Sequence, residues 1–469
     1  MSAVIQSQPA PAATTTALQP LARGDGSRAI AFDAHGEVAL DTFFSHVRGL
    51  AAQLPDASHA INLCEDRYRF LVAFCAVALR GQTTLLPPSR TRAAIDDVRA
   101  LHPGSYCLGD GEPCGCEHEH LAPLPHYVRM PDELPQRDGV RPEIDDDALV
   151  AIGFTSGSTG APKPNTKTWG SFRTSTAQNL AALAGLWPDD AIAHVVATVP
   201  PQHMYGMEMS VLLPLLGNVA VHGVRPFFPQ DVAQALHEAN APRLLVTTPV
   251  HLRALVESGV VLPPLAGIVT ATAPLSRELA AAAETAFGCE VREVFGSTET
   301  CVIARRRTAR EDAWTPLPGV RVSPQPDGTL VQAAHLPHAV ILADLMELVD
   351  NGRDGNGRFL LRGRQSDLLE IAGKRASLGD LTRRLLAIPG VEDGVVFQLD
   401  GADRNGVQRI AALVVAPNLS EAGILQALRG SIDPVFLPRR LHRVETLPRN
   451  DSGKLPRAAL LQLLQGSMR

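Results

Sequence analysis

The sequence has almost no lysine. Of its 43 lysine and arginine residues, 39 are arginines, and the lysines are Lys163, Lys167, Lys374 and Lys454. Arginine presents a planar fork, whereas lysine presents a compact, strongly hydrated ammonium. We therefore expect the few lysines to mark places that need a compact charge. Three of the four lie in glycine-containing motifs, and chance retention is the alternative for Lys167.

Other absences exclude whole classes of protein. No apolar run approaches the roughly 20 residues that span a bilayer, so no membrane span is predicted. The net charge of −6 does not favour a nucleic-acid partner. Residues 1–25 lack the basic start and apolar centre of a signal peptide and are expected to form a disordered tail. The 7 cysteines are scattered and odd in number, which fits a reducing compartment and predicts a cytoplasmic protein.

The length of 469 residues allows two or more domains, and strand-like and helix-like segments alternate along the chain. This alternation predicts an α/β fold. Residues 339–350 and 357–363 are expected to pair as strands, and an apolar helix is expected to run from about 202 through 216. The other expected strands are 60–63, 83–86, 192–199, 219–222, 243–247, 267–270 and 290–294, and the expected helices are 42–52, 68–79, 171–186, 231–239, 249–257 and 277–286.

Two domains are expected to follow the tail, a core of residues 26–364 and a smaller unit of residues 365–469. Residues 365–469 carry a net charge of +3, and residues 1–364 carry −9. A mildly basic second domain suits an acidic partner, although the charge is small.

A loop rich in hydroxyl groups follows a predicted buried strand, Ala148–Phe154. Its glycines allow backbone N–H groups to approach a ligand closely, and a lysine adds positive charge, so the loop suits a phosphate. It lacks the G-x-x-x-x-G-K-[ST] pattern of a Walker A loop, and Pro164 disfavours a helix beginning at the lysine. The candidate phosphate-binding residues are Thr155, Ser156, Gly157, Ser158, Thr159, Gly160 and Lys163.

The segment TSGSTGAPKP resembles the phosphate loop of the AMP-forming adenylating enzymes, which include acyl- and aryl-CoA synthetases, peptide-synthetase adenylation domains and firefly luciferase. Motifs in the order of that family recur between about residues 60 and 457. The resemblance implies a large multilayer α/β N-terminal domain with a β subdomain, and a small mobile α+β lid. It also implies ATP and Mg²⁺ as cofactors.

A second motif, Phe295-Gly296-Ser297-Thr298-Glu299, resembles the family's Y-G-x-T-E. The resemblance implies that Thr298 binds the α-phosphate and that Glu299 helps to hold Mg²⁺, a cation that prefers oxygen ligands. Phenylalanine replaces tyrosine at position 295. Stacking on adenine is expected to survive this change, whereas a phenol hydrogen bond is lost.

The remaining nucleotide contacts are implied by segments that match the family's motifs at fewer positions. The segment Ala271-Thr272-Ala273 resembles an adenine-side motif. Asp344 resembles the ribose-binding aspartate without its preceding threonine and glycine, and Arg364 is expected to bind the ribose or a phosphate from the opposite side. A strand-end ion pair is the alternative for both.

Near the C-terminus, residues 447–457 resemble the closing motif of the family, with Asn450 in place of a threonine. Lys454 is then expected to neutralise charge between the attacking carboxylate and the α-phosphate. Ser366 occupies the hinge position, usually Asp or Lys, and the lid is expected to turn there and present a second face near Gly373–Arg375. His203 matches an aromatic position beside the acyl pocket, or is a core histidine. Tyr205, Met207, Thr248 and Thr272 are further pocket candidates.

The predicted function is an ATP-dependent ligase that forms an acyl- or aryl-adenylate from a small carboxylic acid and transfers the acyl group to a thiol. The sequence resembles the acyl-carrier-protein ligases of aryl-polyene and xanthomonadin pigment biosynthesis, which implies a carrier protein and a hydroxybenzoate-like aromatic acid. An aryl- or acyl-CoA ligase and a catalytically impaired nucleotide-binding regulator are the alternatives. The basic residues expected to meet the carrier protein or CoA are Arg383, Arg384, Arg439, Arg440 and Arg443. Cysteines and histidines between Cys107 and His120 lack the spacing of a standard zinc module, so adventitious metal affinity is favoured there.

Overall fold

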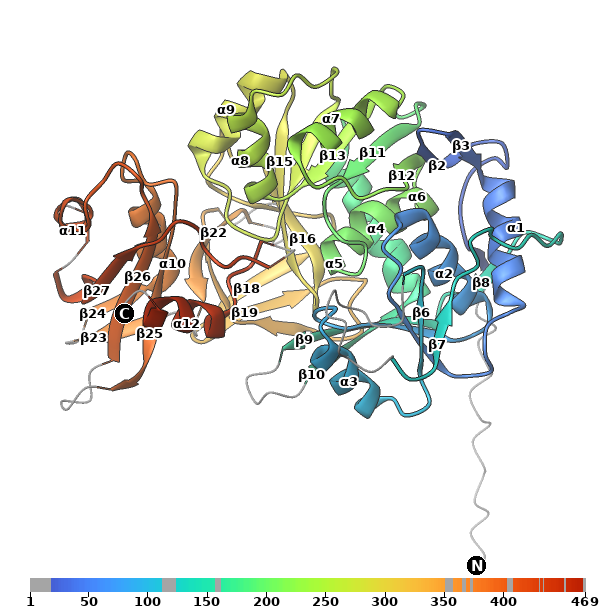
Figure 1. Ribbon diagram of the computed structural model, residues 1–469, viewed down its shortest axis with the longest axis horizontal. Coiled ribbons are helices and arrows are strands. Elements are labelled where there is room, and N and C mark those ends of the chain that lie inside the picture. Colours follow the sequence, from blue (N-terminus) through green and yellow to red (C-terminus); the bar gives the residue numbers. More distant parts are fainter. Residues whose placement is uncertain are drawn as a thin grey trace, which may run out of the picture.

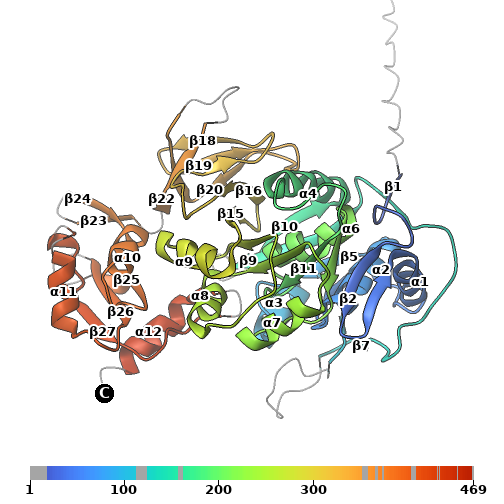
Figure 2. The ribbon, with the colours of Figure 1, turned by 90° about the horizontal axis from the view of Figure 1, so that it is seen from above.

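The computed structural model shows a large body of sheets and helices with a smaller C-terminal unit at one end (Figures 1 and 2). The body contains the blue to yellow elements, and the smaller unit contains the deep orange and red ones. The structure describes residues 18–111, 124–156, 162–350, 357–364, 368–371, 374–402, 408–429, 431–432, 434–450 and 453–466.

A nine-stranded sheet forms the centre of the body. Its six middle strands are parallel neighbours, and the two strands at one edge and the single strand at the other are antiparallel. The parallel strands are short, apolar and buried on both faces, as expected where helices cover both sides of a sheet. In sheet order the nine strands are β17 (Thr315–Pro316), β16 (Cys301–Arg306), β15 (Val291–Ser297), β14 (Gly267–Thr270), β13 (Arg243–Thr247), β11 (Ala193–Ala197), β12 (Val219–His222), β2 (Ala29–Asp33) and β3 (Gly36–Ala39).

A second sheet has six strands, and helices separate it from the first. Five of these strands, from β9 to β7 in sheet order, are parallel neighbours, and β9 also forms an antiparallel hairpin with β10. In sheet order they are β10 (Pro162–Thr168), β9 (Leu149–Ser156), β5 (Thr83–Leu86), β4 (His59–Asn62), β6 (Tyr106–Gly109) and β7 (Tyr127–Arg129).

Helices fill the space between the two sheets and cover the outer face of the larger one. One apolar core joins both sheets, and a second lies under the outer helices α7, α8 and α9. The helices of the body are α1 (Leu40–Ala51), α2 (Arg67–Leu79), α3 (Arg92–Leu101), α4 (Trp169–Leu183), α5 (Met204–Met207), α6 (Leu213–Leu216), α7 (Pro229–Glu238), α8 (Pro249–Ser258) and α9 (Arg277–Phe287).

Smaller sheets follow in the chain. One contains three strands and the next contains two, and both lie between the body and the C-terminal unit in Figure 1. The C-terminal unit has its own apolar clusters. The strands are β18 (Arg321–Gln325), β19 (Gly328–Gln332), β20 (Val340–Leu342), β21 (Asp344–Leu348), β22 (Phe359–Arg364), β23 (Leu368–Ile371), β24 (Lys374–Ser377), β25 (Asp393–Ala402), β26 (Gln408–Val415) and β27 (Arg440–Arg443), and the helices are α10 (Leu378–Leu386), α11 (Glu421–Arg429) and α12 (Arg457–Gly466).

Three expectations are corrected. The expected tail extends too far, because β1 (Leu18–Pro20) pairs with β8 (Glu143–Asp145) and Leu21 beyond it is buried. The expected strand 339–350 is two strands, of which β20 pairs with β19 and only β21 pairs with β22. The expected helix ending at residue 216 contains a π-helical turn, Glu208–Leu212, between α5 and α6. The boundary at residue 365 stays a prediction.

No helix in the described parts of the chain is both long enough and apolar enough to cross a membrane.

Candidate active site

The predicted site segments gather where parallel strands end. Strands β13, β14 and β15 are parallel neighbours, so their carboxyl ends meet at one edge of the nine-stranded sheet. Thr248 follows β13, Ala271–Ala273 follows β14, and Thr298–Glu299 follows β15. Ligands of open α/β sheets bind at such an edge.

The second sheet reaches the same place through β9. A Cβ atom added to Gly153 would lie 2.7 Å from Cγ2 of Thr298 and 3.1 Å from Cε of Met204. The strand that leads into the glycine-rich loop therefore packs directly against the Thr298 turn. Thr155 pairs with the exposed Lys163 across the β9–β10 hairpin. Gly157, Ser158, Thr159, Gly160 and the side chain of Ser156 lie outside the described residues.

The turn after β15 is tightly constrained. A Cβ atom on Gly296 would lie 2.1 Å from the carbonyl oxygen of Cys301, so only glycine fits there. The hydroxyls of Ser297 and Thr300 are 3.1 Å apart, and each accepts a backbone N–H from the other residue. Among the described residues, the side chains of Thr298 and Glu299 have no hydrogen bond or ion pair, although both are partly buried. They are therefore available to a ligand.

Phe295 precedes this turn and lies beside two other aromatic rings. Its ring centroid is 5.5 Å from that of Trp314 and 6.4 Å from that of Phe359. The ring is partly exposed, so one part of its surface is left for a further contact. Stacking on adenine stays a prediction.

Asp344 and Arg364 occupy directly opposite positions in the β21–β22 pair. The structure thus brings together two residues that the sequence separates widely. The side chain of Arg364 is outside the described part of the chain, and the ribose contacts stay predictions.

Thr272 carries an unusual backbone conformation, with φ of 81°. Of the three non-glycine residues with positive φ in the described residues, two lie at this site, the other being Cys301 with φ of 58°. Such conformations cost energy and cluster at functional sites. The hydroxyl of Thr272 is a buried atom without a hydrogen-bond partner, while Ala271 is buried and Ala273 is partly buried.

The loop that carries Lys454 docks on this edge from the C-terminal unit. A Cβ atom on Gly453 would lie 3.6 Å from Cγ2 of Val250 and 3.8 Å from Oγ1 of Thr272. In Figure 2 the red end of the chain lies beside α8, which contains Val250. Asn450, which replaces the family's threonine, accepts the backbone N–H of Lys454 at 2.8 Å.

His203 lies within the electrostatic reach of Lys454. It caps the N-terminus of α5, where its Nδ1 accepts the backbone N–H of Tyr205 at 3.3 Å. Burial, followed by the positive charge of Lys454, lowers the pKa of His203 to about 4. The imidazole is therefore neutral at pH 7, and it lies near the loop of the C-terminal unit that carries Lys454.

The other acid-pocket candidates are mostly satisfied within the protein. Tyr205 is buried and its hydroxyl donates to the carbonyl of Val269 at 2.9 Å. Met207 is buried, and Thr248 caps α8 by accepting the N–H of His251. Their roles in binding an acid stay predictions.

Lys167, for which chance retention was the alternative, has a defined structural position. Its side chain is only 4% exposed, and its ammonium donates to the carbonyl oxygen of Glu299 at 3.0 Å. The sequence did contain a signal, because Lys167 is one of four lysines in the chain. Its partner was hidden because 132 positions separate the two residues.

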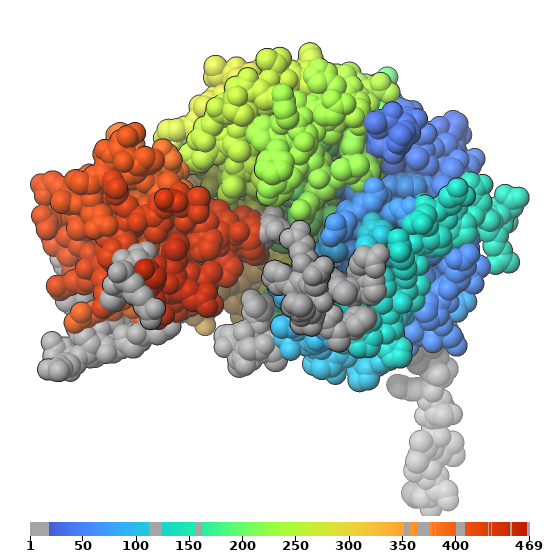
Figure 3. All heavy atoms as spheres, in the orientation of Figure 1, coloured from blue at the N-terminus to red at the C-terminus, as the bar shows by residue number. Residues whose placement is uncertain are grey.

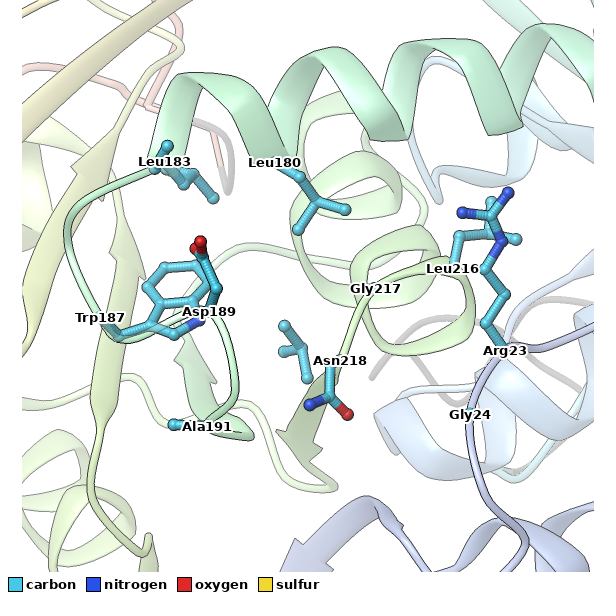
Figure 4. A pocket seen from close by; sticks show the side chains of 12 residues that line it. Arg23, Gly24, Leu180, Leu183, Trp187, Asp189, Ala191, Leu216, Gly217 and Asn218 are labelled. Carbon is cyan, nitrogen blue, oxygen red and sulfur yellow. The ribbon is translucent and has the colours of Figure 1, made fainter.

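Some predictions fall outside this site. Ser366, Gly373 and the segment from Cys114 to His120 are outside the described residues. Within the described residues, no group of three His, Cys, Asp or Glu side chains could hold a metal ion. A pocket of about 410 Å³ opens beside the end of α4, near Trp187, Asn218 and Arg23 (Figure 4). None of the predicted site residues lines it, so it is separate from the site.

Residues 63–341 match the family model described as AMP-binding enzyme. The chain belongs to the AMP-binding enzyme family. A 4-coumarate–CoA ligase of Rhodobacter capsulatus is 32% identical over 308 residues, covering 65% of this chain and 74% of the relative.

Solved structures of the o-succinylbenzoate CoA synthetase of Bacillus subtilis share the fold. The complex with the acyl-adenylate intermediate has a TM-score of 0.78 at 19% identity, covering 95% of this chain and 98% of the other. The complex with ATP and magnesium has a TM-score of 0.75 at 19% identity, covering 92% and 96%. The predicted α/β class is thus confirmed. The family match and the 32% identical relative confirm the prediction of an AMP-forming, ATP-dependent ligase.

ATP and Mg²⁺ are the cofactors of this AMP-binding enzyme, as predicted. The described residues fit them. Glu299 supplies a single unpaired carboxylate, which suits Mg²⁺ because that ion is usually held by one or two carboxylates together with phosphate oxygens and water. The unpartnered hydroxyl of Thr272 and the side chain of Thr298 add hydrogen-bonding groups on the same edge.

Proposed function

We propose that this AMP-binding enzyme activates a small aromatic carboxylic acid as its adenylate and then transfers the acyl group to a phosphopantetheine thiol. The observation that carries the proposal is the docking of the Gly453–Lys454 loop beside Thr272 and His203. A lysine held there neutralises charge while an oxygen of the acid attacks the α-phosphate and pyrophosphate leaves. Mg²⁺ supplies further charge neutralisation when it is bound.

Each residue of the site has an assigned part in this proposal. Thr298 binds the α-phosphate, Glu299 holds Mg²⁺, and Phe295 packs on adenine. Asp344 and Arg364 bind the ribose, and the glycine-rich loop with Lys163 binds the outgoing phosphates. His203, neutral at pH 7, borders the acid.

CoA is the first candidate acceptor, because the relatives described above are named as CoA ligases. An acyl carrier protein is the second, favoured by the resemblance of the sequence to pigment-pathway ligases. Arginines exposed on α10 and near β27 offer positive charge to either acceptor; they are Arg383, Arg384, Arg439, Arg440 and Arg443.

The experiment is a product analysis. Purified protein is incubated with ATP, Mg²⁺ and one acid from a panel of 4-coumarate, 4-hydroxybenzoate, malonate and a fatty acid, with either CoA or a holo carrier protein. We expect AMP and an aryl thioester, identified by mass. If no acid of the panel supports pyrophosphate exchange, the proposal is overturned and a nucleotide-binding regulator is favoured.

A further inference from the structure

Three polar side chains are buried around the turn that carries Thr298 and Glu299. Lys167 is 4% exposed, Glu208 is 1% exposed and His335 is 3% exposed. They come from β10, from the π-helical turn and from the connection between β19 and β20. Segments far apart in the sequence therefore converge on one short stretch of backbone.

Two of the three hold carbonyl oxygens of this stretch. The ammonium of Lys167 donates to the carbonyl of Glu299 at 3.0 Å, and Nε2–H of His335 donates to the carbonyl of Thr300 at 2.7 Å. Burial lowers the pKa of His335, which keeps the ring neutral at pH 7 with one N–H to donate. Buried side chains thus hold both carbonyl groups in place.

Glu208 holds the next amide. Its two carboxylate oxygens accept the backbone N–H of Val302 at 3.1 and 3.0 Å. Ser175 and Asn179 of α4 also donate to it, at 3.2 and 3.0 Å. Burial raises the pKa of Glu208, while these hydrogen bonds and the charge of Lys167 act in the opposite direction.

Buried polar side chains contribute less to a core than apolar ones. Removing a polar or charged group from water costs free energy, and well-packed apolar residues are often at least as stabilising. Lys167 and Glu208 both direct their polar atoms at the backbone of residues 299–302. A fixed conformation of this turn is what the arrangement provides beyond packing.

We propose that Lys167, Glu208 and His335 form a clamp on residues 299–302 that positions the carboxylate of Glu299 for Mg²⁺ and the hydroxyl of Thr298 for the α-phosphate. In this proposal, which rests on the proposed function, the three are positioning residues that touch neither substrate nor metal. Lys167 has the most direct connection, because it holds the backbone of the metal ligand itself.

The test is a double-mutant cycle on nucleotide binding. The affinity for ATP is measured by calorimetry with Mg²⁺ and with EDTA, in wild type, Lys167→Met, Glu299→Gln and the double variant. We expect Lys167→Met to reduce the gain from Mg²⁺ about tenfold and to leave binding in EDTA within about threefold. Because Lys167 acts through Glu299, Glu299→Gln should cost little more once Lys167 is replaced.

Arg292→Met is the matched control. Arg292 is also a buried cation that donates to backbone carbonyls, those of Ala182 and Ala184 at 2.7 and 2.9 Å, and it pairs with Glu290 at 2.6 Å. Within the described residues, none of its hydrogen bonds reaches the turn. Its loss is expected to lower thermal stability without changing the gain from Mg²⁺. If Lys167→Met does not fold, Glu208→Gln replaces it in the cycle, with a smaller expected loss because an amide oxygen still accepts from Val302.

Three outcomes would overturn the clamp. They are additive effects of the Lys167 and Glu299 substitutions, a Lys167→Met variant that matches Arg292→Met, and wild-type protein that gains nothing from Mg²⁺. Magnesium-dependent ATP binding without pyrophosphate exchange for any acid would instead overturn the proposed function alone.

Discussion

The turn that carries Glu299 and the loop that carries Lys454 are held in different ways. The turn is surrounded by the buried side chains of Lys167, Glu208 and His335 within the body. The loop belongs to a unit with its own apolar clusters and approaches the body at Gly453. In Figure 3 the two units are distinct masses in contact. In the proposed function, the turn is therefore the fixed half of the site, which binds the nucleotide, and the loop is the movable half, which supports catalysis.

Removing the charge of the movable half should have the largest effect. We expect Lys454→Ala to slow adenylate formation on the order of 10²–10³-fold, the range for loss of one group that stabilises developing charge. Thioester formation from supplied acyl-adenylate should remain within a few-fold of wild type. Both half-reactions are measured in single turnover, and an equal loss in each would place Lys454 in the fixed half.

The sequence predicted the body well because its parallel strands are short, buried and β-branched, and strands 83–86, 219–222, 243–247 and 267–270 agree to the residue. It failed where tertiary pairing decides, as at Ala343, where one expected strand divides between two sheets. The motif residues on the carboxyl edge were found from the resemblance. The buried partners of the Glu299 turn were not, because a hydrogen bond from Lys167 to a distant carbonyl leaves no local pattern.

A second prediction concerns the fixed half. Gly296→Ala places a Cβ atom 2.1 Å from the carbonyl of Cys301, so the turn must shift. We expect a loss of about 1–3 kcal/mol in unfolding free energy, typical of overpacking, and about tenfold weaker MgATP binding. Gly453→Ala is the control, because φ is 77° there and no contact is closer than 3.6 Å, so only about 1 kcal/mol of local strain is expected. Chemical denaturation measures the unfolding free energy and calorimetry measures the MgATP affinity. Equal losses in the two variants would contradict the idea that the Glu299 turn is held more tightly than the Lys454 loop.

A third, smaller effect is expected inside the C-terminal unit. Arg449 binds the carboxylate of Asp393 through two nitrogens, at 2.9 and 2.7 Å, and donates to the carbonyl of Gly453 at 2.8 Å. Arg449→Met should loosen the lysine loop and slow adenylation about threefold to tenfold, with MgATP affinity unchanged. Arg362→Met, which removes an exposed pair with Glu347, is the control. A loss of MgATP affinity equal to the loss of rate would show that Arg449 supports the body.

The smallest effect tests whether the two halves meet in solution. Burial and Lys454 hold the pKa of His203 at about 4, below its ordinary 6.5. Between pH 6.5 and 4 the unfolded chain binds a proton that the folded chain does not, so stability must fall as the pH falls through this window. His203→Asn keeps a capping acceptor without a titrating ring, and should reduce the drop in Tm between pH 7 and 5 by about 1–2 °C. Because burial is the larger cause, Lys454→Ala should raise the pKa of His203 only part of the way toward 6.5, as followed by NMR. An unchanged pKa in that variant would mean that the lid charge does not reach the histidine, and the docked arrangement would then not be the one populated in solution.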